Sequence, residues 1–149
     1  MRDKILPVIF LAVVLAVLPG CVSPDQQLRS LVTQRLALAP EVAWNKFHSG
    51  QAVRDPAREA AILSKFQDPA TRRFFADQIS ASRSIQEKLI ASWRSGSKRP
   101  SHPPVDLTRD IRPAIDAIDR RQLAAIAHGA TMPGPAEIEN LSKQIPSKP

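Results

Sequence analysis

The sequence is poor in the residues that build metal sites, disulfides and phosphate-binding loops. It has one cysteine, three histidines and five glycines in 149 residues. A single cysteine excludes an intramolecular disulfide and a cysteine-based metal site, and the histidines do not have the spacing of metal ligands. No glycine-rich phosphate loop is present. These absences exclude a zinc finger, a P-loop enzyme, a Rossmann domain and a small disulfide-framed secreted protein.

Length and composition favour one folded domain. Apolar residues make up 43% of the chain, which suits a buried core and argues against wholesale disorder. The length is sufficient for one domain and short for two. Lysine and arginine outnumber aspartate and glutamate by 21 to 14, a formal net charge of +7. Because the basic residues are scattered and only 5% of residues are aromatic, we do not expect nucleic-acid binding.

Residues 1–20 are predicted to be an export signal. Arg2 and Lys4 precede an apolar run over residues 5–18 that a single proline interrupts. This run is short for a membrane-spanning helix and typical of a signal-peptide core. It ends in Leu-Pro-Gly-Cys at residues 18–21, which resembles a bacterial lipoprotein cleavage site.

The cleavage pattern gives Cys21 a specific predicted role. Cys21 would carry the lipid, become the first residue of the mature chain and tether the domain over residues 21–149 to a membrane in the periplasm. Two alternatives stay open: an ordinary secretory signal with an incidental cysteine, and an uncleaved anchor. Each of the three places the domain outside the cytoplasm. Removal of residues 1–20 lowers the net charge of +7 by only one, so the basic character belongs to the domain.

The rest of the chain is predicted to be all-α, because apolar residues recur at helical spacing without any alternating strand pattern. Helix starts are indicated where a capping side chain precedes a first turn, at Ser23, Asp55, Asp68 and Asp106. The predicted helices cover residues 24–47, a short stretch from 56, 69 to about 94, 107–128 and a short stretch over 136–144. Pro40 should kink the first of these helices, and Pro113 should bend the start of the fourth.

Polar residues fall where these helices should face the core. Arg35 and Lys46 are eleven residues apart, about three helical turns, and so share the apolar face of the first helix. Gln78, Ser82 and Gln86 recur every four residues on the inner face of the third helix. Long cationic side chains can extend their charged ends to solvent, but a buried cation without an anionic partner costs several kcal/mol. The pattern therefore predicts an interior pocket for a small dianion.

Asp55, Arg58 and Glu59 add three further polar residues to this spaced pattern, between Lys46 and Ser82. The local sequences at residues 34–37, 55–59 and 75–79 support the same pattern. Together they resemble the all-helical chorismate mutases over about residues 28–128, and the string at 75–79 is similar to the secreted, periplasmic subclass in particular. The resemblance implies a type II chorismate mutase bundle of three to four main helices with a kinked first helix, followed by a short tail over residues 129–149.

The resemblance also implies an activity, which is the Claisen rearrangement of chorismate to prephenate in phenylalanine and tyrosine biosynthesis. The family needs no metal and no organic cofactor. The implied substrate-binding residues are Arg35, Lys46, Asp55, Arg58, Glu59, Ser82, Gln86 and Arg121. Lys46 and Gln86 would be the catalytic donors to the ether oxygen, and Arg35 and Arg121 would bind the two carboxylates. Arg112 and Arg120 are the weaker candidates for the position given to Arg121.

Other readings and partners stay open at the level of sequence. An isochorismate-pyruvate lyase uses the same bundle and a similar pocket, although export disfavours it because that lyase serves a cytoplasmic pathway. A non-catalytic anion-binding lipoprotein is the third reading. The implied partner is the small molecule chorismate, with a membrane contacted only through the lipid at Cys21. A homodimer is a further candidate assembly.

Overall fold

The computed structural model describes residues 22–146, so the predicted export signal and Cys21 lie outside the described residues. Within this range the chain forms six α-helices and one π-helix, and no strand. The elements are α1 (Pro24–Leu36), α2 (Ala39–Ser49), α3 (Pro56–Leu63), α4 (Pro69–Arg94), η1 (Leu107–Ile111), α5 (Arg112–Ala127) and α6 (Pro135–Ser142). The predicted all-α fold is confirmed. None of the described helices is both long enough and apolar enough to span a membrane.

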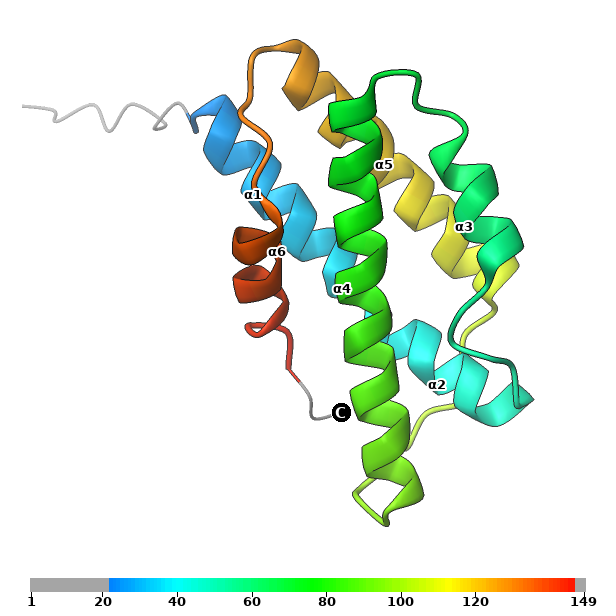
Figure 1. Cartoon of the computed structure of the whole chain (residues 1–149). Helices are drawn as coiled ribbons and strands as arrows, with labels where there is room; N and C mark the ends of the chain where they lie inside the picture. The colour runs from blue at the N-terminus through cyan, green and yellow to red at the C-terminus, as the bar shows by residue number, and fades with distance from the viewer. Residues whose placement is uncertain (1–21, 147–149) are drawn as a thin grey trace, which may run out of the picture.

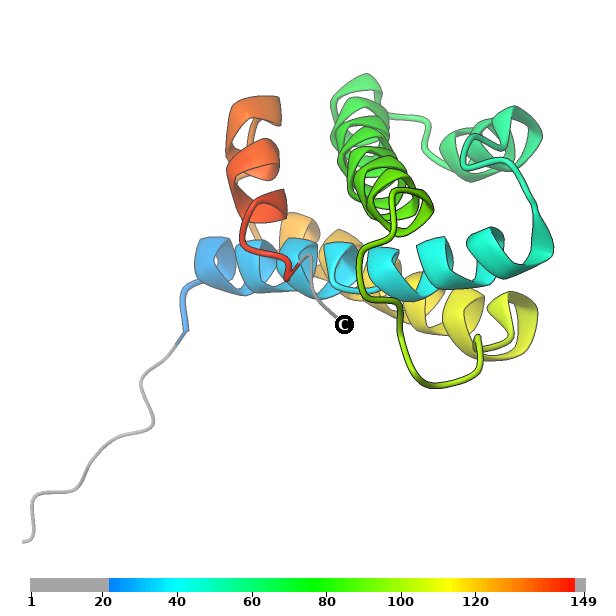
Figure 2. The ribbon, with the colours of Figure 1, turned by 90° about the horizontal axis from the view of Figure 1, so that it is seen from below.

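The helices are arranged in two layers. In Figure 2, α3, α4 and α6 lie in one layer, and α1, α2 and α5 lie in the other. The long helix α4 runs through the length of the molecule (Figure 1), with α6 packed on it near one side and α2 across its second half. Helix α5 packs along α1. This arrangement places the end of α1, all of α2 and α3, the middle of α4 and the start of α5 around one region.

The predicted kink of the first helix at Pro40 is confirmed, and it divides this helix into α1 and α2. Helix α1 ends at Leu36, and α2 begins at Ala39 with Pro40 in its first turn. Proline lacks a backbone N–H, and its ring clashes with the carbonyl four residues earlier, which here belongs to Leu36. The break therefore falls on the N-terminal side of the proline. It changes the direction of the helix, so the face of α2 that carries Lys46 has a different orientation from the face of α1 that carries Arg35.

The predicted bend at the start of the fourth helix is a π-helix. Asp106 caps this element as expected, because its carboxylate accepts hydrogen bonds from the backbone N–H groups of Thr108 and Arg109 at 2.8 Å each. Pro113 then lies in the first turn of α5, where it cannot donate to the carbonyl four residues earlier. Short π-helices often occur at functional sites, and this one directly precedes Arg112.

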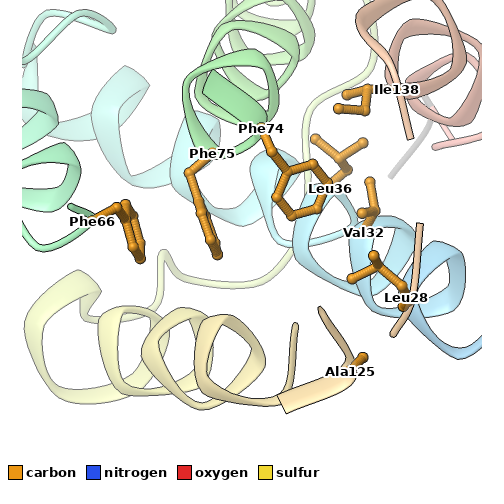
Figure 3. Packing of buried hydrophobic residues seen from close by; sticks show 9 residues of the cluster. Leu28, Val32, Leu36, Phe66, Phe74, Phe75, Ala125 and Ile138 are labelled. Carbon is orange, nitrogen blue, oxygen red and sulfur yellow. The ribbon is translucent and has the colours of Figure 1, made fainter. Parts of the chain in front are cut away.

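The core consists of a main apolar cluster and an aromatic cluster. In the main cluster, Phe74 of α4 lies beside Leu36 of α1, and Phe75 stacks on Phe66 with ring centroids 4.2 Å apart (Figure 3). The aromatic cluster joins Trp44, Phe47, Leu89, Ile90 and Trp93 of α2 and α4. Since Ile138 is fully buried, α6 belongs to the core, and the segment predicted as a tail contributes to the packing of the domain.

Candidate active site

Two adjoining cavities are lined by residues of α1, α2, α3, α4 and α5. The smaller cavity, of about 110 Å³, is named the inner cavity because the buried side chains of Arg35 and Gln86 line it, and the larger one, of about 340 Å³, is named the outer cavity. They form one site because both are lined by Val42, Lys46, Asp55, Arg58 and Ile115. A site of this size suits a small-molecule ligand.

Seven of the eight predicted substrate-binding residues line the inner cavity. These are Arg35, Lys46, Asp55, Arg58, Glu59, Ser82 and Gln86. They come from α1, α2, the start of α3 and the middle of α4, so the tertiary fold gathers residues that are distant in sequence. The eighth, Arg121, lies elsewhere.

Arg35 is held by an ion pair with a residue of another helix. Its Nε donates to Asp119 Oδ1 of α5 at 2.8 Å, and the two side chains are 5% and 13% exposed. Burial raises the pKa of Asp119, against the opposing effect of the Arg35 charge. The expected anionic partner of a buried cation is therefore present. The pair leaves the other guanidinium donors of Arg35 available at the cavity.

Lys46 lies at the junction of the two cavities, in the last turn of α2. Its Nζ donates a hydrogen bond to the carbonyl of Val53 in the segment that leads to α3. Burial lowers its pKa, and the nearby carboxylates of Asp55 and Glu59 partly oppose that effect. An ammonium group has three N–H donors, so Lys46 keeps donors for a ligand after the bond to Val53.

The first turn of α3 presents three charged groups to the site. Asp55 caps this helix by accepting a hydrogen bond from the Arg58 backbone N–H at 3.1 Å. Burial lowers the pKa of the Arg58 side chain, and the positive charge of Arg112 lowers it further. The carboxylate of Glu59 accepts hydrogen bonds from Arg83 Nη1 of α4 at 3.2 and 3.4 Å.

Gln78, Ser82 and Gln86 all lie on the inner face of α4, as their spacing predicts. Gln78 packs against α5, whereas Ser82 and Gln86 line the inner cavity. Gln78 and Gln122 of α5 are fully buried and exchange two amide hydrogen bonds of 3.1 and 2.9 Å. This pair fixes α4 against α5 and lies outside the cavities. One and two turns further on, Ser82 and Gln86 line the inner cavity.

Gln86 has one unsatisfied buried atom. Its Nε2 donates to Ser82 Oγ at 3.0 Å, while its Oε1 is buried without a hydrogen-bond partner in the described part of the chain. The oxygen and nitrogen of an amide are distinguished by their hydrogen-bond partners. Rotation of the amide by 180° would let the Ser82 hydroxyl donate to Oε1 and would place an N–H donor where the unpaired oxygen now lies.

Arg121 does not line the site, because its position around the axis of α5 places it on a different face of that helix. It is exposed and lines neither cavity, whereas Arg112 lines the outer cavity. The two arginines are nine residues apart on a continuous α-helix, which is two and a half turns and places them on opposite faces. Arg120, which adjoins Arg121, is also exposed. Of the three candidate arginines, the structure brings only Arg112 to the cavities.

Positive charge dominates the lining of the two cavities. The cationic side chains are Arg35, Lys46, Arg54, Arg58, Arg83 and Arg112, and the acidic ones are Asp55 and Glu59. Guanidinium groups bind carboxylates through paired hydrogen bonds. The site therefore suits a small ligand with more than one carboxylate. Residues 22–146 contain no group of three or more His, Cys, Asp and Glu side chains arranged to hold a metal ion.

The sequence did not point to Asp119 or Arg83, and it favoured Arg121 over Arg112, which is the arginine of α5 that lines a cavity. A weak signal existed for Asp119, which follows Arg112 by seven residues and thus shares its helix face. The spacing of residues gave no indication of a role for Arg83, since its ion-pair partner Glu59 belongs to another helix.

The comparisons with known proteins agree with this architecture. Residues 23–87 match the family model described as chorismate mutase type II. The chain is 34% identical over 115 residues to a protein named secreted chorismate mutase from Mycolicibacterium smegmatis, a match that covers 70% of this chain and 62% of that relative. The fold is similar to the crystal structure of chorismate mutase from Burkholderia thailandensis, with a TM-score of 0.68, 35% identity and coverage of 79% of this chain and 82% of the other. A chorismate mutase from Burkholderia phymatum matches with a TM-score of 0.62 and 25% identity, over 80% of each chain.

Proposed function

The chain belongs to the chorismate mutase type II family, and from this premise we propose that it catalyses the rearrangement of chorismate to prephenate. The observation that carries the proposal is the composition of the cavity. Six cationic side chains and the amide of Gln86 surround a space suited to a small dicarboxylate. The relative from Mycolicibacterium smegmatis and the two Burkholderia structures, all chorismate mutases by name, support the same activity.

In this proposal, the protein accelerates a unimolecular [3,3] shift by holding the flexible substrate in its reactive conformation. Arg35, which is fixed by Asp119 and lines the inner cavity, and Arg112, which lines the outer cavity, bind the two carboxylates. Glu59, with the Asp55 turn, faces the ring hydroxyl, and Ser82 faces the ring carboxylate. Positioning of this kind removes much of the entropic part of an activation barrier.

Lys46 and Gln86 would stabilise the negative charge that develops on the ether oxygen as the bond breaks. Lys46 has donors left after its bond to Val53. Gln86 contributes Nε2 once its amide is turned so that Ser82 donates to Oε1, which also satisfies the buried oxygen. A preorganised donor of this kind contributes about 3–4 kcal/mol to transition-state stabilisation.

The experiment that tests the proposal is a pair of substrate assays on the purified mature chain. We expect it to convert chorismate to prephenate without added metal or cofactor and to release no pyruvate. Formation of pyruvate from isochorismate, with chorismate left unchanged, would assign the site to a lyase instead. Binding of dicarboxylates with no turnover of either substrate would identify a non-catalytic anion-binding protein.

The position of Arg112 predicts a clear difference between two arginines of α5. Arg112→Ala should reduce kcat/KM by on the order of 10², because it removes a charged partner of a substrate carboxylate. Arg121→Ala should change kcat/KM by less than about twofold, since Arg121 is exposed on the opposite face. Steady-state kinetics on the two variants measure both values. A large loss in Arg121→Ala together with a silent Arg112→Ala would contradict this assignment.

The proposal includes export and a lipid anchor at Cys21. The similarity to a secreted chorismate mutase supports export, and the pattern at residues 18–21 supports lipidation. Cys21→Ser should move the protein from the membrane fraction to the soluble periplasmic fraction while its melting temperature stays the same. Fractionation followed by immunoblotting measures this change. Unchanged membrane association of the variant would point to an uncleaved anchor.

A further inference from the structure

Helix α3 carries site residues but is weakly held by its own packing. It contributes Arg58 and Glu59 to the inner cavity, and its cap Asp55 lines both cavities. Yet none of its eight residues is buried. Figure 2 shows α3 at the edge of its layer, and its packing contacts are with α4. A helix this short is not stable in isolation, so it depends on contacts with the rest of the fold.

The contacts between α3 and the body of the domain are of two kinds. Ile62 and Leu63, near the end of the helix, pack partly buried against the main apolar cluster. At the start of the helix, the connection is the ion pair between Glu59 and Arg83, whose side chains are 21% and 27% exposed. The apolar contacts hold the second half of the helix, where Ile62 also lines the inner cavity, and the ion pair holds the first turn, which carries the charged site residues.

Arg83 lies next to Ser82 on α4 and itself lines the inner cavity. One of its terminal nitrogens, Nη1, donates to both carboxylate oxygens of Glu59. Because the pair is partly shielded from water, it constrains the direction of the Glu59 side chain more than a fully exposed pair would. The Glu59 carboxylate also lies close enough to Lys46 to oppose the lowering of the Lys46 pKa by burial.

We propose that Arg83 is a positioning residue, which acts through Glu59 to hold the first turn of α3 against α4 and so sets the shape of the substrate site. This inference rests on the proposed chorismate mutase activity. Loss of Arg83 would release Glu59 and loosen the first turn of α3, so substrate binding would weaken. Lys46 and Gln86 belong to α2 and α4, and the step they assist would change little once substrate is bound.

The kinetic test compares Arg83→Gln and Arg83→Lys with Arg73→Gln, an exposed arginine on the same helix. Arg83→Gln should raise KM about tenfold and change kcat by less than about threefold, whereas Arg83→Lys should restore most of the affinity. Arg73→Gln should match the unmodified protein. In a double-mutant cycle, Arg83→Gln added to Glu59→Gln should cost less than about twofold further. Additive losses in the cycle, or a loss confined to kcat, would overturn the proposal.

A second measurement does not depend on catalysis. Amide hydrogen exchange in residues 57–63 should become about fivefold faster in Arg83→Gln, and exchange in the interior of α4 should not change. Unchanged exchange in α3 would overturn the role of Arg83 even if the enzyme is active. If the purified chain does not convert chorismate but α3 still loosens in Arg83→Gln, the proposed activity fails while the link between Arg83 and α3 stands.

Discussion

Replacement of Lys46 by alanine is expected to reduce kcat/KM for chorismate by on the order of 10³. Lys46 lies where the two cavities join, with N–H donors directed by its bond to Val53. Its loss removes a donor to the breaking ether bond and a positive charge beside the substrate carboxylates. Most of the loss should therefore appear in kcat, with a smaller rise in KM. Steady-state kinetics at a fixed neutral pH measure the split.

The control for this variant is Lys88→Ala, which removes an exposed lysine from α4 and should leave kcat/KM unchanged. The unmodified enzyme should also lose activity as pH rises, since deprotonation of Lys46 removes its positive charge and one of its three N–H donors. Burial lowers the pKa of Lys46 below its ordinary value of 10.5, so activity should fall at a lower pH than an exposed lysine would give. A fully active Lys46→Ala variant would contradict the proposed mechanism.

Replacement of Gln86 by glutamate is expected to move the activity to acid pH. The amide of Gln86 donates at any pH, whereas an isosteric carboxyl group donates only when it is protonated. At neutral pH the variant should lose activity by on the order of 10² or more, because a carboxylate would face the developing negative charge. As pH falls and the new carboxyl group binds a proton, kcat/KM should recover. The pH dependence of kcat/KM for both proteins measures this shift.

The fold of the Gln86→Glu variant should be intact, which its melting temperature at acid pH checks. Gln78→Glu is the comparison within the same helix, since Gln78 pairs with Gln122 and lies outside the cavities. That change should lower stability by leaving a buried charge without a cationic partner, and it should not create a pH optimum. If Gln86→Glu kept its full rate at neutral pH, Gln86 would not face the ether oxygen.

Helix starts could be predicted directly from the sequence because they depend on local chemistry. Ser23, Asp55, Asp68 and Asp106 cap helices where expected, since each side-chain oxygen bonds to backbone N–H groups only two or three residues away. Pro40 interrupts the first helix by a clash with a carbonyl four residues earlier. Such effects act within one turn, so a single sequence carries enough information to predict them.

The inward position of most site residues also followed from the sequence, because helical periodicity determines which residues share a face. Arg35, Lys46, Ser82 and Gln86 were expected on inner faces from their spacing, and they line the inner cavity. Periodicity alone does not determine which other helix each of these inner faces packs against. The family pattern supplied that link for the residues up to Gln86, whereas for the later helix it pointed to Arg121 instead of Arg112.

Only the tertiary structure decided which charged groups meet across helices. The pairs Arg35 with Asp119 and Glu59 with Arg83 join residues of different helices, and their distances depend on how α1, α3, α4 and α5 are rotated and placed. The choice of Arg112 over Arg121 depends on the phase of α5 relative to the cavity. Sequence determines the angles of residues around their own helix axis, whereas the packing of all the helices together determines the rotation and position of each axis.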